Sequence, residues 1–294
     1  MIRRAASAIA ALALAALILA GGAQGAAAGE ANNLRVMTYN IRLDTADDGA
    51  NAWPHRRAAV AALLRFYAPD LFGLQEVRLH QRDALAADLP DYTLLGVGRD
   101  DGRDGGEFAS LAFRTARFRL IGHGDFWLSP TPATPSIGWD AAYPRLATWA
   151  RLADRRTGRR LLVLNTHWDH VGVTARLNSA RLIRAWLNGE RRRCESVVVL
   201  GDFNATPDEA SLRELSADYG DALTLSRSPP FGPAGTFNGF DILHADAAPI
   251  DHVLVSPDVR VERYGVLTHH DAGRLPSDHY PVLADLSFPD RACV

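Results

Sequence analysis

The chain has 294 residues, of which 47% are hydrophobic and 22% are charged, as in a globular protein with a large buried core. Its 32 basic and 34 acidic residues give a formal net charge of −2. A protein that grips duplex DNA by neutralising phosphates is usually basic. The charge therefore disfavours a nucleic-acid partner without excluding it, and the length suits one large α/β domain.

The first thirty residues differ in composition from the rest. Arg3 and Arg4 precede an apolar run over 5–20, and small residues follow over 21–29. That order predicts a signal peptide over 1–28 and a domain over 29–294. The apolar run is about 16 residues, shorter than the roughly 20 of a spanning helix. We therefore expect a periplasmic or secreted protein, without stable membrane insertion and monomeric; an N-terminal anchor is the alternative.

Short apolar runs alternate with helical patterns along the rest of the chain. Period-two or continuous apolar runs predict strands, and three- to four-residue spacing predicts helices at 56–67 and 174–187 and a short helix ending at Leu85. The predicted strands span 34–41, 71–77, 92–97, 110–114, 148–154, 160–166, 196–200, 252–256 and 282–287. The connections 98–107, 124–144 and 219–248 are long, and such loops are usually functional or disordered.

The chain contains two cysteines, Cys194 before a predicted strand and Cys293 in the C-terminal tail. An exported protein can form disulfides. Whether these two sulfurs approach closely enough for a bridge depends on distances that the sequence does not give. A bridge and two unreacted thiols both remain open.

Polar side chains recur where the apolar strands end. Asn40, Glu76 and His167 each close a predicted strand, and Asp202 and Asn204 follow another. Strand ends bring residues from distant parts of the sequence to one edge of a sheet, where clefts form in α/β proteins. A single carboxylate at a strand end is common, but polar residues at the ends of four apolar strands predict a functional site.

The residue types at this edge point to metal chemistry. Carboxylate and amide oxygens suit Mg²⁺, and Glu76 with Asn40 is the obvious pair. His279 offers a base whose ring Asp251 would hold in one tautomer. The sequence lacks the G-x-S-x-G elbow of serine hydrolases, the cysteine pairs of zinc sites and a Walker loop.

Six short motifs occur in order along the chain: MTYNI at 37–41, LQEV at 74–77, NTH at 165–167, GDFNA at 201–205, IDHV at 250–253 and SDHYPV at 277–282. Together they resemble the endonuclease/exonuclease/phosphatase (DNase I-like) superfamily, in an exported bacterial branch. The resemblance implies a four-layer α/β sandwich, with two mixed β-sheets packed face to face and flanked by helices. It also implies a phosphoric ester hydrolase that depends on Mg²⁺ or Mn²⁺.

The resemblance assigns roles to the matching positions. Glu76, Asn40 and Asp278 would hold the metal. The catalytic set would comprise His279, Asp202, Asn204, Asp251 and His167. His279 would contact the scissile phosphate or activate the attacking water, and Asp202 would position that water or assist the leaving group. Which residue is the general base stays open. The family often has an aromatic residue after the motif aspartate, where this chain has His252, which we expect to be a packed core residue.

The loop sequences bear on the substrate. Loop segments such as AWPHRR at 52–57 and GTFNGF at 235–240 resemble those of the bacterial branch more than those of DNA-repair nucleases. We therefore expect a small, carbohydrate or lipid-head-group phosphoester as substrate, with a secreted nuclease as the alternative and a non-catalytic binding domain as a third reading. Candidate substrate-binding residues are Arg145, Trp53, Arg57, His170, Trp139 and Phe237.

Overall fold

The computed structural model describes residues 33–288, and residues 34–288 belong to one compact unit. The predicted signal peptide over 1–28 and Cys293 lie outside the described residues, so export and the Cys194–Cys293 bridge stay predictions. Within 33–288, no helix combines the length and the apolar character needed to cross a bilayer.

Two six-stranded sheets form the centre of the fold. The first has the order β11-β12-β1-β2-β4-β3 and the second the order β5-β6-β7-β8-β10-β9. The first comprises β1 (Asn33–Asn40), β2 (Leu71–Val77), β3 (Tyr92–Leu95), β4 (Phe108–Arg114), β11 (Arg260–Val266) and β12 (Val282–Ser287). The second comprises β5 (Phe118–Trp127), β6 (Leu146–Asp154), β7 (Arg160–His167), β8 (Glu195–Asp202), β9 (Gly220–Asp221) and β10 (Asp251–Val255).

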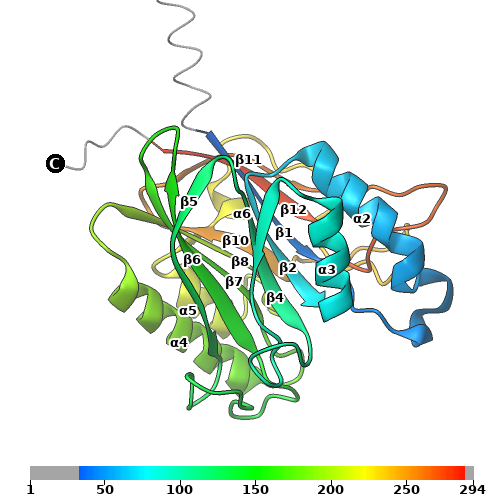
Figure 1. Ribbon diagram of the computed structural model, residues 1–294, viewed down its shortest axis with the longest axis horizontal. Helices are drawn as coiled ribbons and strands as arrows, with labels where there is room; N and C mark the ends of the chain where they lie inside the picture. Colours follow the sequence, from blue (N-terminus) through cyan, green and yellow to red (C-terminus); the bar gives the residue numbers. More distant parts are fainter. Residues whose placement is uncertain (1–32, 289–294) are drawn as a thin grey trace, which may run out of the picture. The chain divides into compact units, whose positions relative to one another are not determined.

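Helices cover the outer face of each sheet (Figure 1). α2 (Trp53–Tyr67) and α3 (Leu79–Asp88) pack on the first sheet, and α4 (Val173–Glu190) and α5 (Ala210–Ser216) on the second. The short elements η1 (Ala46–Asn51) and α6 (Ala222–Leu225) lie in connections. Both sheets are mixed, since β1 pairs with β2 and β7 with β8 in parallel while neighbouring pairs are antiparallel. The expected four-layer α/β sandwich is confirmed.

Strand β8 illustrates how the sequence produces four layers. Successive side chains of a strand point to opposite faces of the sheet. Val198 and Leu200 accordingly join the core between the sheets, while Val197 and Val199 join the core beneath α4 and α5. A strand that is buried on both faces reads as a continuous apolar run, which is how the strand 196–200 appears in the sequence.

A buried amide connects the two sheets. Asn165 of β7 donates from Nδ2 to the carbonyl oxygens of Leu74 (3.0 Å) and Ser110 (2.9 Å) in the facing sheet. Its Oδ1 accepts a 2.7 Å hydrogen bond from Gln75 Nε2. Gly73 leaves room for this crossing, because a β-carbon there would lie 2.2 Å from Asn165 Oδ1. These bonds fix the relative position of β2 and β7, whose ends carry Glu76 and His167.

His252 is a packed core residue, as expected. It is fully buried, with Nδ1 2.7 Å from Asp221 Oδ2 and Nε2 3.0 Å from the Ala205 carbonyl oxygen. A carbonyl oxygen only accepts hydrogen bonds, and so does an ionised carboxylate. Both ring nitrogens therefore donate. Burial by itself lowers the pKa of His252, but Asp221 and the Ala205 carbonyl outweigh burial and raise the pKa above 6.5.

This buried pair predicts a pH-dependent contribution to stability. Replacing His252 with Gln leaves the Asp221 carboxylate without its cation, so the free energy of unfolding should fall by about 3 kcal/mol. Because the folded-state pKa of His252 is raised, the contribution is complete below the unfolded pKa and declines as pH rises through the folded pKa. Urea titrations of wild type and His252→Gln from about pH 6 to about pH 9 measure this difference.

The control is His80→Gln, because His80 also pairs with an aspartate, Asp44 at 2.8 Å, but its side chain is 59% exposed. An exposed pair contributes little, so this variant should match wild type at every pH. A stability difference at His252 that stays constant or grows with pH would contradict the assignment of a buried imidazolium.

Candidate active site

The polar strand ends meet at one edge shared by both sheets. Asn40 ends β1 and pairs in register with Gln75, next to Glu76, in the parallel neighbour β2. In the second sheet, His167 at the end of β7 lies opposite Asp202 at the end of β8. Strand β10 runs antiparallel to β8 and begins at this edge, which places Asp251 in register with Asp202. The two halves of the site thus belong to different sheets.

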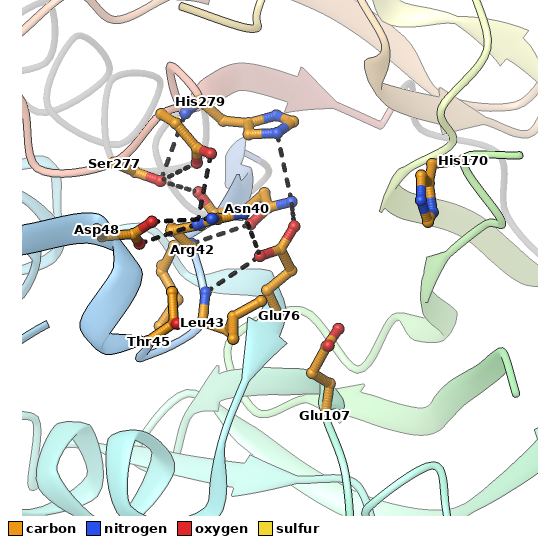
Figure 2. A network of polar contacts seen from close by, with 12 residues as sticks. Asn40, Arg42, Leu43, Thr45, Asp48, Glu76, Glu107, His170, Ser277 and His279 are labelled. Carbon is orange, nitrogen blue, oxygen red and sulfur yellow. Dashed lines mark hydrogen bonds and ion pairs between the residues drawn. The ribbon is translucent and has the colours of Figure 1, made fainter. Parts of the chain in front are cut away.

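Asn40 links the two halves. Its Nδ2 donates to Glu76 Oε1 at 3.0 Å and to Asp202 Oδ2 at 2.9 Å, and lies 3.5 Å from His279 Nε2. Figure 2 shows Asn40, Glu76 and His279 pointing toward one another. Asn40, Asp202 and His279 are all buried, so water competes weakly for these hydrogen bonds.

His279 and Asp251 form a buried dyad. Nδ1 of His279 lies 2.8 Å from Asp251 Oδ2, and this bond fixes the ring so that Nε2 faces Asp202, 3.8 Å from its Oδ2. His167 approaches the same oxygen from the second sheet, with Nε2 at 3.6 Å. Asp202 therefore lies between two imidazoles, with Asn40 as its hydrogen-bond donor.

Backbone strain is concentrated at this edge. Glu76 has φ 61° and Asn204 has φ 46°, in the left-handed region that non-glycine residues seldom occupy. Asn204 donates its backbone N–H to Asp202 Oδ1 at 2.9 Å and its Nδ2 to the Trp168 carbonyl at 3.0 Å. Strained residues persist where the surrounding structure holds them, often at functional sites. Here the strain turns Glu76 and Asn204 at the ends of β2 and β8.

Asp202 and the two imidazoles beside it, those of His279 and His167, differ in pKa. Burial and the neighbouring Asp251 raise the pKa of Asp202 to about 7. Burial opposes protonation of His279, but Asp251 and Asp202 outweigh it and raise the His279 pKa well above 6.5. Burial, with Arg145 and Arg99, holds the pKa of His167 well below 6.5. Near neutral pH, His279 is cationic, His167 is neutral, and Asp202 is poised to exchange a proton.

The donor set fits a divalent cation. Asp251 Oδ1 is buried and has no hydrogen-bond partner among the described residues, and burial, with Glu76 nearby, raises the pKa of Asp278. Buried carboxylates that lack compensating charge are stabilised by a metal ion, and oxygen ligands are those that Mg²⁺ and Mn²⁺ prefer. The residues at this edge are therefore chemically suited to the divalent metal that the sequence resemblance implies.

Two groups of side chains are candidates for the metal. Asp202, Asp251 and His279 offer atoms within 4.8 Å of one another. The dyad itself accounts for much of that proximity, since Nδ1 and Oδ2 already bind each other. Glu76 is the freer ligand: within 33–288, its oxygens accept hydrogen bonds from Asn40 Nδ2 and from the Leu43 N–H at 3.1 Å, and Arg42 forms a longer ion pair at 3.8 Å. The assignment of Glu76, Asn40 and Asp278 to the metal stays a prediction, as do the catalytic roles.

A pocket of about 810 Å³ opens over this edge. Of the expected substrate-binding residues, Arg145, His170 and Phe237 line it. The Phe237 ring lies edge-on to His279, 5.2 Å between centroids. Glu76, His167, Asp202, Asn204, Asp278 and His279 line it too, so most of the predicted site residues converge on one cavity.

The other three expected substrate-binding residues do not line this pocket. Trp53 starts α2 and is 4% exposed, packed in the core beneath that helix with the Arg56 guanidinium 5.6 Å from its ring. Arg57 pairs with Asp88 of α3 at 2.8 Å. Trp139 is 39% exposed, in a loop next to the residue that caps α4. Core packing and helix pairing, which the local sequence does not reveal, explain why Trp53 and Arg57 lie away from this pocket.

Several residues near the pocket were not anticipated. Arg42 faces three carboxylates: Asp48 at 2.9 Å, and Glu76 and Asp278 at 3.8 Å each. Arg56 is fully buried and donates to the carbonyl oxygens of Asn51, Ile41, Arg42 and Pro276, which connects η1 and the segment before His279. Single arginines in loops carry no distinguishing sequence signal, so only the fold identifies them.

The shared edge of the two sheets brings together carboxylates, amides and a His–Asp dyad, groups suited to the metal-dependent hydrolysis of phosphoric esters. The model of the Endonuclease/Exonuclease/phosphatase family matches residues 37–279. The chain belongs to this family, and it is a metal-dependent phosphoric ester hydrolase.

Individual proteins that resemble this chain support the family assignment. An endonuclease/exonuclease/phosphatase family protein from Bacteroides thetaiotaomicron is 37% identical, with 88% of this chain and 98% of that chain covered and a TM-score of 0.85. A mannosyl-6-phosphatase from the same organism is 37% identical, with 87% and 100% covered and a TM-score of 0.83. An uncharacterized protein of Acanthamoeba polyphaga mimivirus is 25% identical over 187 residues, 58% of this chain and only 66% of that protein.

The His279–Asp251 dyad gives a direct prediction. Asp251→Asn removes the charge that holds His279 protonated and oriented, so kcat should fall by about 10²- to 10⁴-fold. The measurement is steady-state hydrolysis of a phosphoester with saturating Mg²⁺ or Mn²⁺. The matched control is Asp221→Asn, which breaks the other buried His–Asp pair, at His252. That variant should lose stability but keep the kcat of its folded fraction; equal kcat losses would refute a specific role for the dyad.

Proposed function

We propose that this enzyme is an exported, Mg²⁺- or Mn²⁺-dependent phosphoesterase that hydrolyses a small phosphoester whose alcohol is a carbohydrate or a similar head group. The observation that carries the proposal is the position of the Asp202–His279–Asp251 cluster at the base of a pocket large enough for a sugar phosphate. The 37% identity to a mannosyl-6-phosphatase over the whole of that chain supports the carbohydrate class.

The protonation states suggest how the residues divide the work. His279, cationic and held by Asp251, would donate from Nε2 to a phosphoryl oxygen and stabilise the charge that develops there. Asp202, whose pKa of about 7 suits a general base, would take a proton from the attacking water. As the bond between phosphorus and the alcohol oxygen breaks, the leaving oxygen would take up a proton from solvent and depart as the alcohol. Asn204 and His167 would contact the same transition state. A divalent ion bound near Glu76 would supply additional neutralisation of phosphoryl charge.

A substrate panel tests the proposal. The mature protein is assayed with sugar monophosphates, p-nitrophenyl phosphate, a phosphodiester, plasmid DNA and RNA, each with Mg²⁺, Mn²⁺, Ca²⁺ or a chelator. Metal-dependent release of phosphate from the monoesters, with little degradation of nucleic acid, is the expected result. Rapid degradation of DNA or RNA without monoesterase activity would favour the nuclease alternative, and inactivity in every assay would favour a binding domain.

The metal assignment gives a variant prediction. Glu76→Gln keeps the shape of the side chain but removes its charge, so activity should fall by about 100-fold and the half-saturating Mg²⁺ concentration should rise by 10-fold or more. Titrating Mg²⁺ in a steady-state assay measures both quantities. Glu190→Gln changes a carboxylate with a 50% exposed side chain, remote from the pocket lining, and serves as the control. A Glu76 variant with wild-type metal dependence would place the ion elsewhere.

Export is tested separately. The proposed signal peptide over 1–28 predicts that the full chain, expressed in a Gram-negative host, is recovered as a monomer from the periplasm or medium. N-terminal sequencing and gel filtration measure this, and the mature chain should begin close to Gly29. An intact N-terminus in the membrane fraction would support the anchor alternative.

A further inference from the structure

A group of polar and aromatic side chains lines the pocket away from the catalytic edge; we call it the arginine wall. It consists of Arg99, Glu107, Tyr143, Arg145 and His170. Figure 2 shows His170 and Glu107 standing apart from the network around Asn40 and His279. A phosphate that reacts at the catalytic edge would leave this wall facing the remainder of the substrate.

The charges of the wall cancel. Arg99 pairs with Glu107 at 2.8 Å, and Arg145 pairs with Asp169, which lies behind it, at 3.4 Å. Nδ1 of His170 lies 3.1 Å from Arg145 Nη2. A guanidinium only donates hydrogen bonds, so Nδ1 of His170 accepts this one. A surface without net charge suits a neutral polar ligand better than a second anion.

The wall still has hydrogen-bonding capacity and apolar faces. Arg145 is 5% exposed, and its Nη1 is buried without a hydrogen-bond partner among the described residues. A buried donor of this kind is costly unless a ligand satisfies it. Tyr143 stacks on His170 (6.0 Å, 18°) and lies 5.0 Å from the Arg99 guanidinium. Stacked rings give a flat surface whose negative face attracts polarised C–H groups.

We propose that the arginine wall binds the neutral, hydroxyl-bearing part of the substrate, a sugar ring or similar polyol, and so determines which alcohol the enzyme accepts. This inference rests on the proposed function. Hydroxyl groups supply the acceptor that Arg145 Nη1 lacks and donors for Glu107, while the ring face packs on Tyr143.

Asp169 is the positioning residue of this wall. Its buried carboxylate accepts from the N–H groups of Val171 (3.0 Å) and Gly172 (2.7 Å) through Oδ1. Through Oδ2 it accepts from Ala142 (3.1 Å), Tyr143 (3.4 Å) and Arg145 Nε (3.4 Å). One side chain thereby holds together the loop that carries Tyr143 and Arg145 and the segment that carries His170.

The test compares substrates that share the phosphate and differ in the alcohol. Mannose 6-phosphate and glucose 6-phosphate carry ring hydroxyls, whereas p-nitrophenyl phosphate carries none. Variants Arg145→Gln, Tyr143→Ala and His170→Ala should lower kcat/KM for the sugar phosphates by about 10- to 100-fold, mainly through KM. For Tyr143→Ala and His170→Ala, kcat/KM for p-nitrophenyl phosphate should stay within about three-fold of wild type. Arg145→Gln is judged on the sugar phosphates alone, because Arg145 also lowers the pKa of His167. Because Tyr143 and His170 are exposed, those two variants should fold even if Arg145→Gln does not.

Phe66→Ala is the control, since Phe66 is 78% exposed on α2 and does not line the pocket; it should match wild type on every substrate. Asp169→Asn should reproduce the sugar-specific rise in KM with kcat for p-nitrophenyl phosphate retained, which a loss of fold alone would not do.

Any of the following results would overturn the inference: equal losses on sugar and aryl phosphates, no loss on either, or a wild-type preference for fructose 1,6-bisphosphate that Arg145→Gln abolishes. The last result would assign the wall to a second anion. If the wild-type enzyme cleaves p-nitrophenyl phosphate in the presence of metal but cleaves no sugar phosphate, the inference about the arginine wall is refuted and the phosphoesterase activity stands. Wild-type enzyme that cleaves neither would also remove the proposed function on which the inference rests.

Discussion

The active site depends on the contact between the two sheets at Asn165. Asn40 and Glu76 belong to one sheet, and His167, Asp202 and Asp251 to the other, so the geometry of the site is set by how the sheets are aligned. Apolar packing between sheets is not directional, whereas the three hydrogen bonds of Asn165 to Gln75, Leu74 and Ser110 are. A buried amide that is fully paired specifies one alignment among many of similar packing energy.

The same division explains the electrostatics of the site. Asp202 is buried between groups contributed by both sheets: Asn40 from one, and Asp251 and His167 from the other. Its raised pKa results from burial together with the adjacent Asp251. The burial exists only when the sheets close on one another, whereas Asp251 is the neighbour of Asp202 within one sheet. The unfolded chain would carry an ordinary aspartate at this position, so the reactivity of Asp202 is a product of tertiary structure.

The sequence predicted the centre of the fold and much of the site, for an identifiable reason. Strands buried on both faces read as continuous apolar runs, and the polar residues that end them, such as Glu76 and Asp202, stand out against that background. Strands β5 and β11 were not predicted, because several of their residues are exposed and their patterns are weak. The strand expected at 110–114 begins at Phe108.

The substrate-binding residues were predicted less well, because an arginine reveals nothing of its partner. Arg56 and Arg57 are neighbours on α2, yet one is buried among backbone carbonyls and the other pairs with Asp88 of α3. Arg99 and Glu107 lie at the two ends of a loop whose sequence does not indicate their 2.8 Å ion pair. Contacts between loops depend on the path of the backbone, which local patterns do not encode.

The attachment of the arginine wall to Asp169 has a consequence for how such enzymes diversify. The residues of the wall lie in loops, whereas the reacting groups lie at the ends of strands. The Asn165 amide fixes the relative position of those strands. In the role proposed for the wall, substitutions at Tyr143 would alter which alcohol is accepted and leave the reacting groups at the strand ends in place. The loop that carries this choice is tied to Asp169 through the N–H groups of Ala142 and Tyr143, so a change of substrate by loop remodelling would require an acceptor at position 169.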